Sequence, residues 1–245
     1  MANLTILHTN DMHGKLSAGL ADRISRVRAS AEGPVILLDA GDAVASGNIT
    51  YRPEGERILA LMSDTGYDAM AVGNREFHLT PIGFRAKTRL ARFPVLSANI
   101  RSRSDGGKPP CLPFVLRDIP GFGVLAIFGI TVPMITERMA VRHLSAYTFD
   151  DPERTAHALA GQLRNKCAML ICLSHAGLAV DRAIARADTG IDLIVGGHTH
   201  AALETGERYG RTLVVQAGSH AKFVGRVTVT VSAGALDLNA ELLAL

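Results

Sequence analysis

The sequence has few of the residues from which a membrane span, a disulfide framework or an aromatic clamp is built. Its 245 residues include no tryptophan, and aromatic residues make up 5% of the chain. Cysteine occurs as Cys111, Cys167 and Cys172, an odd number of which two lie near or within an apolar run, so we expect buried reduced thiols. No apolar run approaches the length of a membrane span, and the N-terminus lacks the segments of a signal peptide. We therefore expect a soluble cytoplasmic protein without a membrane partner.

The charge of the chain is nearly balanced. Lysine and arginine number 26 against 23 aspartates and glutamates, and this balance does not indicate a nucleic-acid partner. A Walker A glycine loop is absent, and neither Ser174 nor the cysteines have the sequence setting of an activated nucleophile. Hydrophobic residues are abundant at 47%, which is enough for a sizeable core, and no break in composition divides the chain. We predict a single domain over residues 1–245.

Apolar strand-like runs alternate with helical patterns through most of the chain. The predicted strands cover residues 4–9, 34–38, 68–72, 94–98, 168–173 and 191–195. The predicted helices cover residues 18–31, 54–65, 81–92, 152–165 and 179–187. This alternation favours an α/β core whose strands end on a shared edge, and ligand sites of such sheets lie beyond the carboxyl ends of the strands.

Three regions of the chain follow a different pattern. Residues 114–116 and 123–130 flank a Pro-Gly turn and predict a hairpin. Residues 212–216 and the alternating residues 227–231 predict antiparallel strands with no helix between them. Residues 101–110 form a polar, basic loop, which is either a solvated surface or a segment that attracts anions.

Side chains of metal-binding type follow the ends of the predicted strands. They are Asp11, His13, Asp42, Asn74, His175, His198 and His200. These nitrogen and oxygen donors exceed what one tetrahedral ion takes, whereas two ions that share a carboxylate would use them all. We predict a site for two divalent ions, among which Mn, Zn, Fe and Ni suit these donors. Two such ions about 3.5–4 Å apart activate water for displacement at phosphorus, so the predicted reaction is phosphate-ester hydrolysis.

Five short motifs carry these side chains in a fixed order. They are Asp11-x-His13, Gly41-Asp42, Gly73-Asn74, Ser174-His175 and Gly197-His198-Thr199-His200. In this order they resemble the motifs of the calcineurin-like metallophosphoesterases. The surrounding sequence is most similar to the N-terminal catalytic domain of the bacterial 5′-nucleotidase and UDP-sugar hydrolase family, over nearly the whole chain.

The resemblance implies a fold and a ligand set. The implied fold is a four-layer α/β/β/α sandwich, in which two mixed β-sheets pack face to face with helices outside. The implied ligands of the first metal are Asp11, His13, Asp42 and His200, and those of the second are Asp42, Asn74, His175 and His198. Asp42 would bridge the two metals.

The turn after Gly73 departs from the family pattern. The resemblance implies a histidine directly after Gly-Asn and an aspartate three residues later, and this chain has Arg75 and His78 there. Arginine does not release a proton at working pH, but it can hold a phosphoryl oxygen and stabilise accumulating charge. We expect Arg75 to bind the phosphate, and His78 either to supply the acid function or to be a surface residue. Asn74, Arg75 and His78 are the candidate catalytic residues.

A second departure concerns the substrate. The nucleotidases carry a further C-terminal domain that grips the nucleoside, whereas this chain ends at Leu245 and has few aromatic residues for a stacking clamp. We expect weak nucleotide selectivity, or a homo-oligomer or partner chain that completes the substrate site. The predicted activity is hydrolysis of small or nucleotide-like phosphomonoesters, with some diesterase activity. The alternative is a binding or regulatory module that retains the metals but has little turnover.

Several further residues leave two interpretations open. Asp39 and Asp192 either orient ligand histidines or cap turns. Asn99 ends a predicted strand, and the resemblance favours a contact with substrate over a turn. We expect structural roles for four histidines that have no partner spacing, namely His8, His143, His157 and His220. Cys172 is expected in the core.

Overall fold

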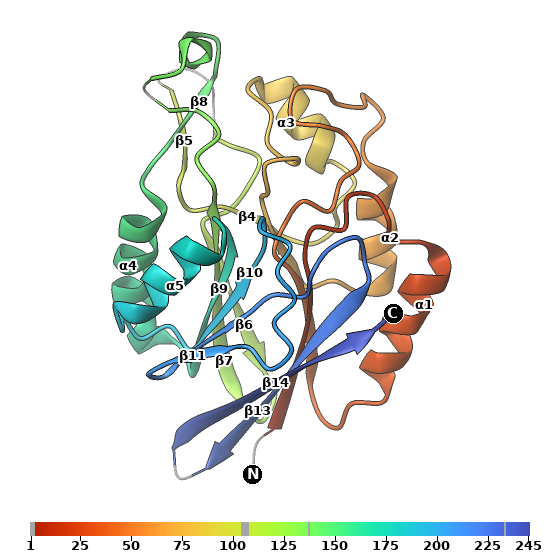
Figure 1. Cartoon of the computed structure of the whole chain (residues 1–245), viewed down its shortest axis with the longest axis vertical. Helices are drawn as coiled ribbons and strands as arrows, with labels where there is room; N and C mark the ends of the chain where they lie inside the picture. The colour runs from red at the N-terminus through yellow and green to blue at the C-terminus, as the bar shows by residue number, and fades with distance from the viewer. Residues whose placement is uncertain (1–2, 104–107, 137, 233) are drawn as a thin grey trace.

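The computed structural model describes residues 3–103, 108–136, 138–232 and 234–245, and in these residues two six-stranded sheets dominate the fold (Figure 1). The first sheet has the order β14 (Ala235–Ala244), β13 (Phe223–Ser232), β1 (Asn3–Thr9), β2 (Val35–Asp39), β3 (Ala69–Ala71) and β4 (Val95–Leu96). The second has the order β11 (Glu207–Tyr209), β12 (Thr212–Val215), β10 (Leu193–Gly196), β9 (Met169–His175), β7 (Gly123–Thr131) and β6 (Phe114–Ile119). A small additional sheet pairs β5 (Ile100–Ser102) with β8 (Tyr147–Phe149).

Helices cover the outer faces of both large sheets. They are α1 (Ala18–Ala29), α2 (Arg57–Thr65), α3 (Pro81–Thr88), α4 (Pro152–Leu163) and α5 (Leu178–Arg186), with 3₁₀ turns η1 (Ala140–His143) and η2 (Arg164–Lys166). In Figure 1, α1 and α2 lie on one side of the molecule and α4 and α5 on the other. The fold is therefore the four-layer α/β/β/α sandwich that the resemblance implied, and that prediction is confirmed.

Strand alternation explains how the layers are held together. Ile6 of the first sheet and Ile127 of the second are buried in one core between the sheets. Because successive strand residues face opposite sides, Leu7 packs with α1 and α2 instead, and Phe128 packs with α4 and α5. Each such buried side chain contributes roughly 1.5–3 kcal/mol to folding.

The parallel strands of both sheets place their carboxyl ends at one end of the molecule. Strands β1, β2, β3 and β4 are parallel in the first sheet, and β7, β9, β10 and β12 are parallel in the second. Their carboxyl ends lie toward the top of Figure 1, where the turns after β1, β2, β3, β9 and β10 come together. The polar residues that follow these strands are therefore gathered from both sheets.

Helix boundaries follow local capping. Thr80 accepts a hydrogen bond from the backbone N–H of Gly83 at 3.2 Å, which starts α3 as predicted. The helix ends at Thr88 rather than near residue 92, because the N–H of Ala91 bonds to the Thr88 carbonyl and closes a tight turn. Helix α2 begins at Arg57 and not at residue 54, because Gly55 has a left-handed φ of 96°.

The prediction for residues 212–216 was wrong in one respect. The sequence predicted an antiparallel strand here, but β12 runs parallel to β10. The chain reverses once through β11, which pairs antiparallel with β12, and so returns in the direction of β10. Strands β5, β8 and β11 have three residues each and were not predicted, because none of them lies in a longer apolar run such as those that contain β3 and β4.

The cysteines and the helices add two findings. Cys172 is buried in the core beneath α4 and α5, Cys111 and Cys167 are half-buried, and all three are free. Within the described ranges, every helix is too short or too polar to cross a bilayer.

Candidate metal centre

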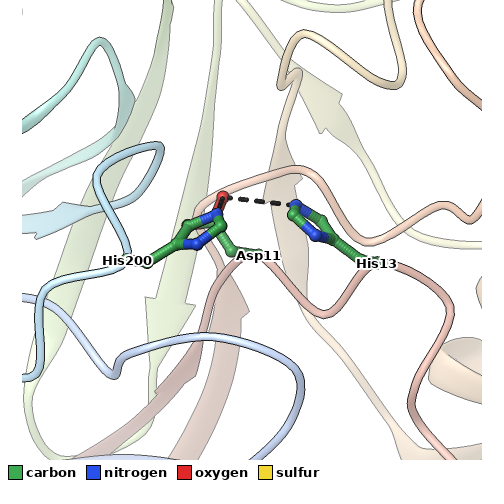
Figure 2. A group of neighbouring side chains, drawn as sticks. All are labelled: Asp11, His13 and His200. Carbon is green, nitrogen blue, oxygen red and sulfur yellow. Dashed lines mark ion pairs between the residues drawn. The ribbon is translucent and has the colours of Figure 1, made fainter.

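Three of the predicted ligands form one tight group at the carboxyl ends of β1 and β10. Figure 2 shows a carboxylate oxygen of Asp11 between the imidazole rings of His13 and His200. The Oδ1 atom of Asp11 lies 3.3 Å from Nε2 of His200 and 3.7 Å from Nε2 of His13. The donor atoms of all three side chains are within 4.8 Å of one another, so a single cation could contact them together.

Asp11, Asp42 and His175 form a second group that shares Asp11 with the first. Asp42 reaches both groups, because its Oδ1 lies 3.4 Å from Nε2 of His175 and its Oδ2 lies 3.5 Å from Nε2 of His13. This position between two histidines is the one that a bridging carboxylate would need.

Asn74 and His198 complete the cluster on the side of His175. The Oδ1 atom of Asn74 lies 3.3 Å from Nε2 of His175 and 3.0 Å from Nδ1 of His198. Its amide nitrogen donates to Oδ1 of Asn48 at 3.2 Å, which keeps the amide oxygen turned toward the histidines. The structure thus brings together all seven side chains that the sequence proposed as metal ligands.

The backbone at this cluster is strained. Asp11, His13, Asp42, His198 and His200 all have left-handed φ angles, between 49° and 73°. Residues with a Cβ rarely adopt this conformation, and where they do they concentrate at functional sites. The left-handed backbone at these tight turns directs the five side chains toward the cluster. An extended backbone at a strand end would direct them elsewhere.

Glycines allow the turns of the two sheets to approach closely. A Cβ on Gly197 would lie 2.8 Å from Nδ1 of His175 and 3.0 Å from the carbonyl oxygen of Ala40. A Cβ on Gly73 would lie 2.3 Å from Oδ1 of Asp42. Any larger residue at either position would push ligand side chains apart.

Two buried atoms of the cluster fit a cation. Oδ1 of Asp11 and Nε2 of His13 are buried and have no hydrogen-bond partner in the described structure. Burial of an unpaired carboxylate oxygen is costly, and a cation at this point would satisfy both atoms. The donors are imidazole nitrogens, carboxylate oxygens and one amide oxygen, a set that suits Mn, Zn, Fe or Ni.

The charges within the cluster shift its proton equilibria. Burial disfavours the charged form of Asp42, but the nearby imidazoles of His13 and His175 outweigh it and hold the pKa of this carboxyl well below its usual range. Burial also disfavours protonation of His175, but the hydrogen bond to Asp42 and the attraction of neighbouring carboxylates raise the pKa of His175 to about 9. A cation that binds here must displace this proton.

Neighbouring groups orient the ligand side chains. Nδ1 of His175 donates to the carbonyl oxygen of Ala40 at 2.7 Å, which leaves Nε2 for the cluster. The buried carboxylate of Glu76 accepts three backbone N–H groups, from Asp42 at 2.8 Å, Val44 at 3.0 Å and Gly73 at 2.8 Å. It therefore ties the turn of Asp42 to the turn of Asn74. The sequence did not single out Glu76, because a carboxylate in a turn gives no sign of its backbone partners.

Asp39 and Asp192 differ in their roles. Asp39 accepts from the N–H of Gly41 at 2.8 Å and from the hydroxyl of Thr9 at 2.6 Å, so it caps the turn that leads to Asp42. Asp192 lies before β10, at the end of the strand away from His198, and pairs with Arg164 and Arg211. The suggestion that Asp192 orients a ligand histidine was therefore wrong.

Arg75 lies beside the cluster. Its Nε is 3.7 Å from Oδ2 of Asp42, and its backbone N–H donates to Oδ1 of the same carboxylate at 2.7 Å. The guanidinium also donates to the carbonyl oxygen of Ala45 at 3.2 Å and remains partly exposed. The buried ammonium of Lys87 donates to the carbonyl oxygens of Arg75 and Gly47, at 2.5 and 2.7 Å. Arg75 is thus fixed at the edge of the cluster with its charge toward Asp42.

His78 and Asn99 are not brought into contact with the cluster. The ring of His78 lies at the start of α3, where Nδ1 accepts from the N–H of Thr80 at 3.1 Å and the ring packs against Tyr51. The amide of Asn99 is fully buried and pairs with the backbone N–H and carbonyl of Thr131, at 2.9 and 2.7 Å. The expected substrate contact of Asn99 is therefore corrected to a structural role, because its amide is already occupied within the protein.

His220 lies next to the cluster although the sequence suggested a structural role for it. Its ring centroid is 5.0 Å from that of His13 and 5.8 Å from that of His200, and its backbone N–H donates to the carbonyl oxygen of Asp11. The side chain is exposed and the residue has a left-handed φ of 60°. His220 follows the carboxyl end of β12, which the sequence predicted as an antiparallel strand, so it was not counted among the residues at the ends of parallel strands.

This chain is similar to known nucleotidases and to a nucleotide phosphoesterase. The chain is 34% identical to the trifunctional nucleotide phosphoesterase protein YfkN of Bacillus subtilis, over 93% of this chain and 18% of that protein. It is 30% identical to a 5′-nucleotidase of Vibrio cholerae, over 96% of this chain and 50% of that protein. The crystal structure of a 5′-nucleotidase precursor from Thermus thermophilus matches with a TM-score of 0.78 at 30% identity, over 100% of this chain and 55% of that one.

This chain spans about half or less of the length of these relatives. The model of the calcineurin-like phosphoesterase family matches residues 4–202, which is most of the sequence and includes all seven side chains of the cluster. The chain belongs to the calcineurin-like phosphoesterase family.

Proposed function

We propose that this chain hydrolyses phosphate monoesters, nucleotide-like or small, with some activity on diesters, at a centre of two divalent cations. The observation that carries this proposal is the pair of buried, unpartnered atoms, Oδ1 of Asp11 and Nε2 of His13, inside a cluster of seven metal-type donors. The names of the relatives, which are nucleotidases and a nucleotide phosphoesterase, support the same reaction class.

The proposed ligand sets are those that the family resemblance implies, and the distances in the cluster are compatible with them. Asp11, His13, Asp42 and His200 would hold the first cation. Asp42, Asn74, His175 and His198 would hold the second, and Asp42 would bridge. When bound, such cations acidify water and neutralise the charge that develops on phosphoryl oxygens.

Arg75 would bind the phosphoryl group of the substrate. Its guanidinium lies at the edge of the cluster and carries donors in a planar fork that matches two phosphoryl oxygens. Because it stays charged throughout the reaction, it would stabilise the negative charge of the transition state without exchanging a proton. The amide of Asn74, turned by Asn48, would keep its oxygen toward the cations.

Metal reconstitution tests the proposal. Chelated protein would be supplied separately with Mn²⁺, Zn²⁺, Ni²⁺ and Mg²⁺ and assayed with p-nitrophenyl phosphate and its bis-ester. We expect metal-dependent turnover that the Asp42→Asn variant lowers by more than about 10–100-fold, since even outer groups around a metal have effects of that size. The exposed Asp237, on β14, offers a matched control, and Asp237→Asn should retain full activity.

Absence of metal-dependent turnover above buffer would overturn the enzymatic proposal. Metal binding without turnover would then favour a binding or regulatory module, which the exchange at Arg75 and His78 permits. Equal loss in Asp42→Asn and Asp237→Asn would show that the activity does not come from the cluster.

A further inference from the structure

An exposed apolar surface lies on the loop that borders the cluster. Ile49 and Tyr51 follow the turn of Asp42 on residues 45–51, and their exposed fractions are 80% and 37%. Exposed apolar side chains beside a candidate site can contact an apolar group of a bound ligand. We refer to Ile49 and Tyr51 together as the Tyr51 shelf.

His78 fixes the shelf in place. The rings of Tyr51 and His78 meet edge to face, with centroids 5.1 Å apart and planes at 80°. A Cβ on Gly83 would lie 2.2 Å from Nδ1 of His78, so this ring sits directly on the first turn of α3. His78 is thus packed between the shelf and the helix.

Three further contacts join the same loop to the cluster. Asn48 bonds to Asn74 at 3.2 Å, Ala45 accepts from the Arg75 guanidinium at 3.2 Å, and Gly47 accepts from Lys87 at 2.7 Å. Lys87 in turn donates to the backbone of Arg75. The shelf therefore has a fixed position relative to Asn74, a proposed metal ligand, and to Arg75, which is proposed to bind the phosphoryl group.

We propose that the Tyr51 shelf binds the apolar or aromatic part of the substrate's leaving group. The proposal rests on the proposed function, because it requires the phosphoryl group to be held by the cluster and Arg75. A phosphate ester held there projects its alcohol portion out of the cluster, and a planar apolar group would lie against Tyr51 and Ile49. His78 is then a positioning residue that supports Tyr51, rather than the acid that protonates the leaving group.

Two substrates that release a primary alkoxide isolate the shelf. Benzyl phosphate and methyl phosphate have the same kind of leaving oxygen, but only benzyl phosphate carries a ring. In Tyr51→Ala, we expect kcat/KM for benzyl phosphate to fall about three- to tenfold more than kcat/KM for methyl phosphate, which is the size of one aromatic contact. Tyr51→Phe should keep the wild-type ratio of the two kcat/KM values, because the ring is still present. Leu116→Ala, at an exposed leucine on β6, should also leave this ratio unchanged.

His78→Ala separates the two roles of the histidine. A positioning role predicts that benzyl and phenyl phosphate lose more than methyl phosphate. An acid role predicts equal losses for benzyl and methyl phosphate and a smaller loss for phenyl phosphate, whose leaving group needs less protonation. The second pattern would overturn the assignment of His78 as a support of the shelf.

Binding of phosphonates tests the shelf without turnover. Benzylphosphonate and methylphosphonate have a carbon–phosphorus bond in place of the ester linkage and are not hydrolysed. Calorimetry on the Mn²⁺-loaded protein therefore reports binding alone. We expect tighter binding of benzylphosphonate by about three- to tenfold, and loss of this preference in Tyr51→Ala. If the protein prefers benzylphosphonate but shows no metal-dependent turnover, the proposed function is wrong and the binding role of the shelf is supported. If both proteins bind the two phosphonates equally, the shelf is overturned whatever the activity.

Discussion

A single buried carboxylate organises two of the ligand-bearing turns. Glu76 accepts from Asp42 and Gly73 with Oε2 and from Val44 with Oε1, and these residues belong to the turns after β2 and β3. Hydrogen bonds to a charged acceptor contribute about 1.5–3 kcal/mol each, more than neutral ones. Burial, followed by repulsion from Asp42, raises the pKa of Glu76. The three N–H groups bond to both carboxylate oxygens, whereas an amide side chain would offer only one oxygen.

Glu76→Gln should weaken metal binding without a large change in side-chain volume. The amide would turn its NH₂ toward at least one backbone N–H and leave it unpaired, so the turns of Asp42 and Asn74 would shift. We expect metal affinity, measured by calorimetric titration of chelated protein, to fall about 10–100-fold. The control is Glu241→Gln at a surface ion pair with Arg226. Unchanged affinity in Glu76→Gln would refute the role assigned to Glu76.

The ligand residues could be predicted from sequence because each follows the end of an apolar strand. Asp11, Asp42 and His175 are separated by long segments, but parallel strands bring their carboxyl ends to one edge. Glu76 and His220 could not be predicted in the same way. Their roles depend on backbone N–H groups and rings from other turns, which are neighbours only after the two sheets have packed.

Helix α3 links the strand-end turns to the apolar loop beside them. Thr80 caps its N-terminus and also contacts Nδ1 of His78 at 2.9 Å, and Lys87 on its last turn bonds to Gly47 and Arg75. Burial lowers the pKa of Lys87 to about 8, although Glu76 and other carboxylates oppose this shift. This short helix thus contacts His78, which packs against Tyr51, and holds the backbone of Arg75 through Lys87.

Thr80→Ala and Ser17→Ala form a matched pair of cap variants. Ser17 caps α1 by accepting from Leu20 at 3.3 Å, as Thr80 caps α3 by accepting from Gly83 at 3.2 Å. Each substitution should cost about 1 kcal/mol, or roughly 2–4 °C in Tm by calorimetry. Only Thr80→Ala should also lower the ratio of benzyl to methyl phosphate turnover, because only this cap contacts His78. A lowered ratio in both variants would mean that general destabilisation is the cause.

Elements were predictable where an apolar run or a helix-end signal marks them in the sequence. Helices α3 and α4 begin where Thr80 with Pro81 and Asp151 with Pro152 predict a start. Strand β12 was assigned the wrong pairing, because the direction of a strand depends on the short β11 hairpin before it. Local sequence fixes whether a segment is extended, but its partner is decided by the packing of the whole sheet.

At the scale of the whole molecule, the two halves of the first sheet meet at His8. This residue of β1 lies opposite Gly225 of β13, and a Cβ on Gly225 would lie 2.0 Å from Nε2 of His8. The ring is buried, Nδ1 has no hydrogen-bond partner in the described structure, and burial lowers the pKa of His8 to about 3. The pairing of the N-terminal strand with the C-terminal strands therefore requires a neutral histidine.

The free energy of unfolding should decrease in acid through His8. The folded-state pKa lies below the ordinary value of 6.5, so the unfolded chain binds the proton first as the pH falls from about 6.5 toward 3. Stability from this residue is complete above pH 6.5 and is lost by about 1 kcal/mol between pH 6 and pH 5. Urea unfolding of chelated wild type and His8→Leu at both pH values measures the difference, in which other groups cancel. Parallel curves for the two proteins would contradict the prediction.

The left-handed turns at Asp11, His13, Asp42, His198 and His200 also affect how variants of this protein should be judged. At each of these positions glycine would relax the backbone while deleting a donor atom. A screen that rewards only resistance to heat would therefore enrich chains that have lost the cluster. Thermal robustness and retention of the centre are opposed at these five positions, and directed evolution of this scaffold has to select for both at once.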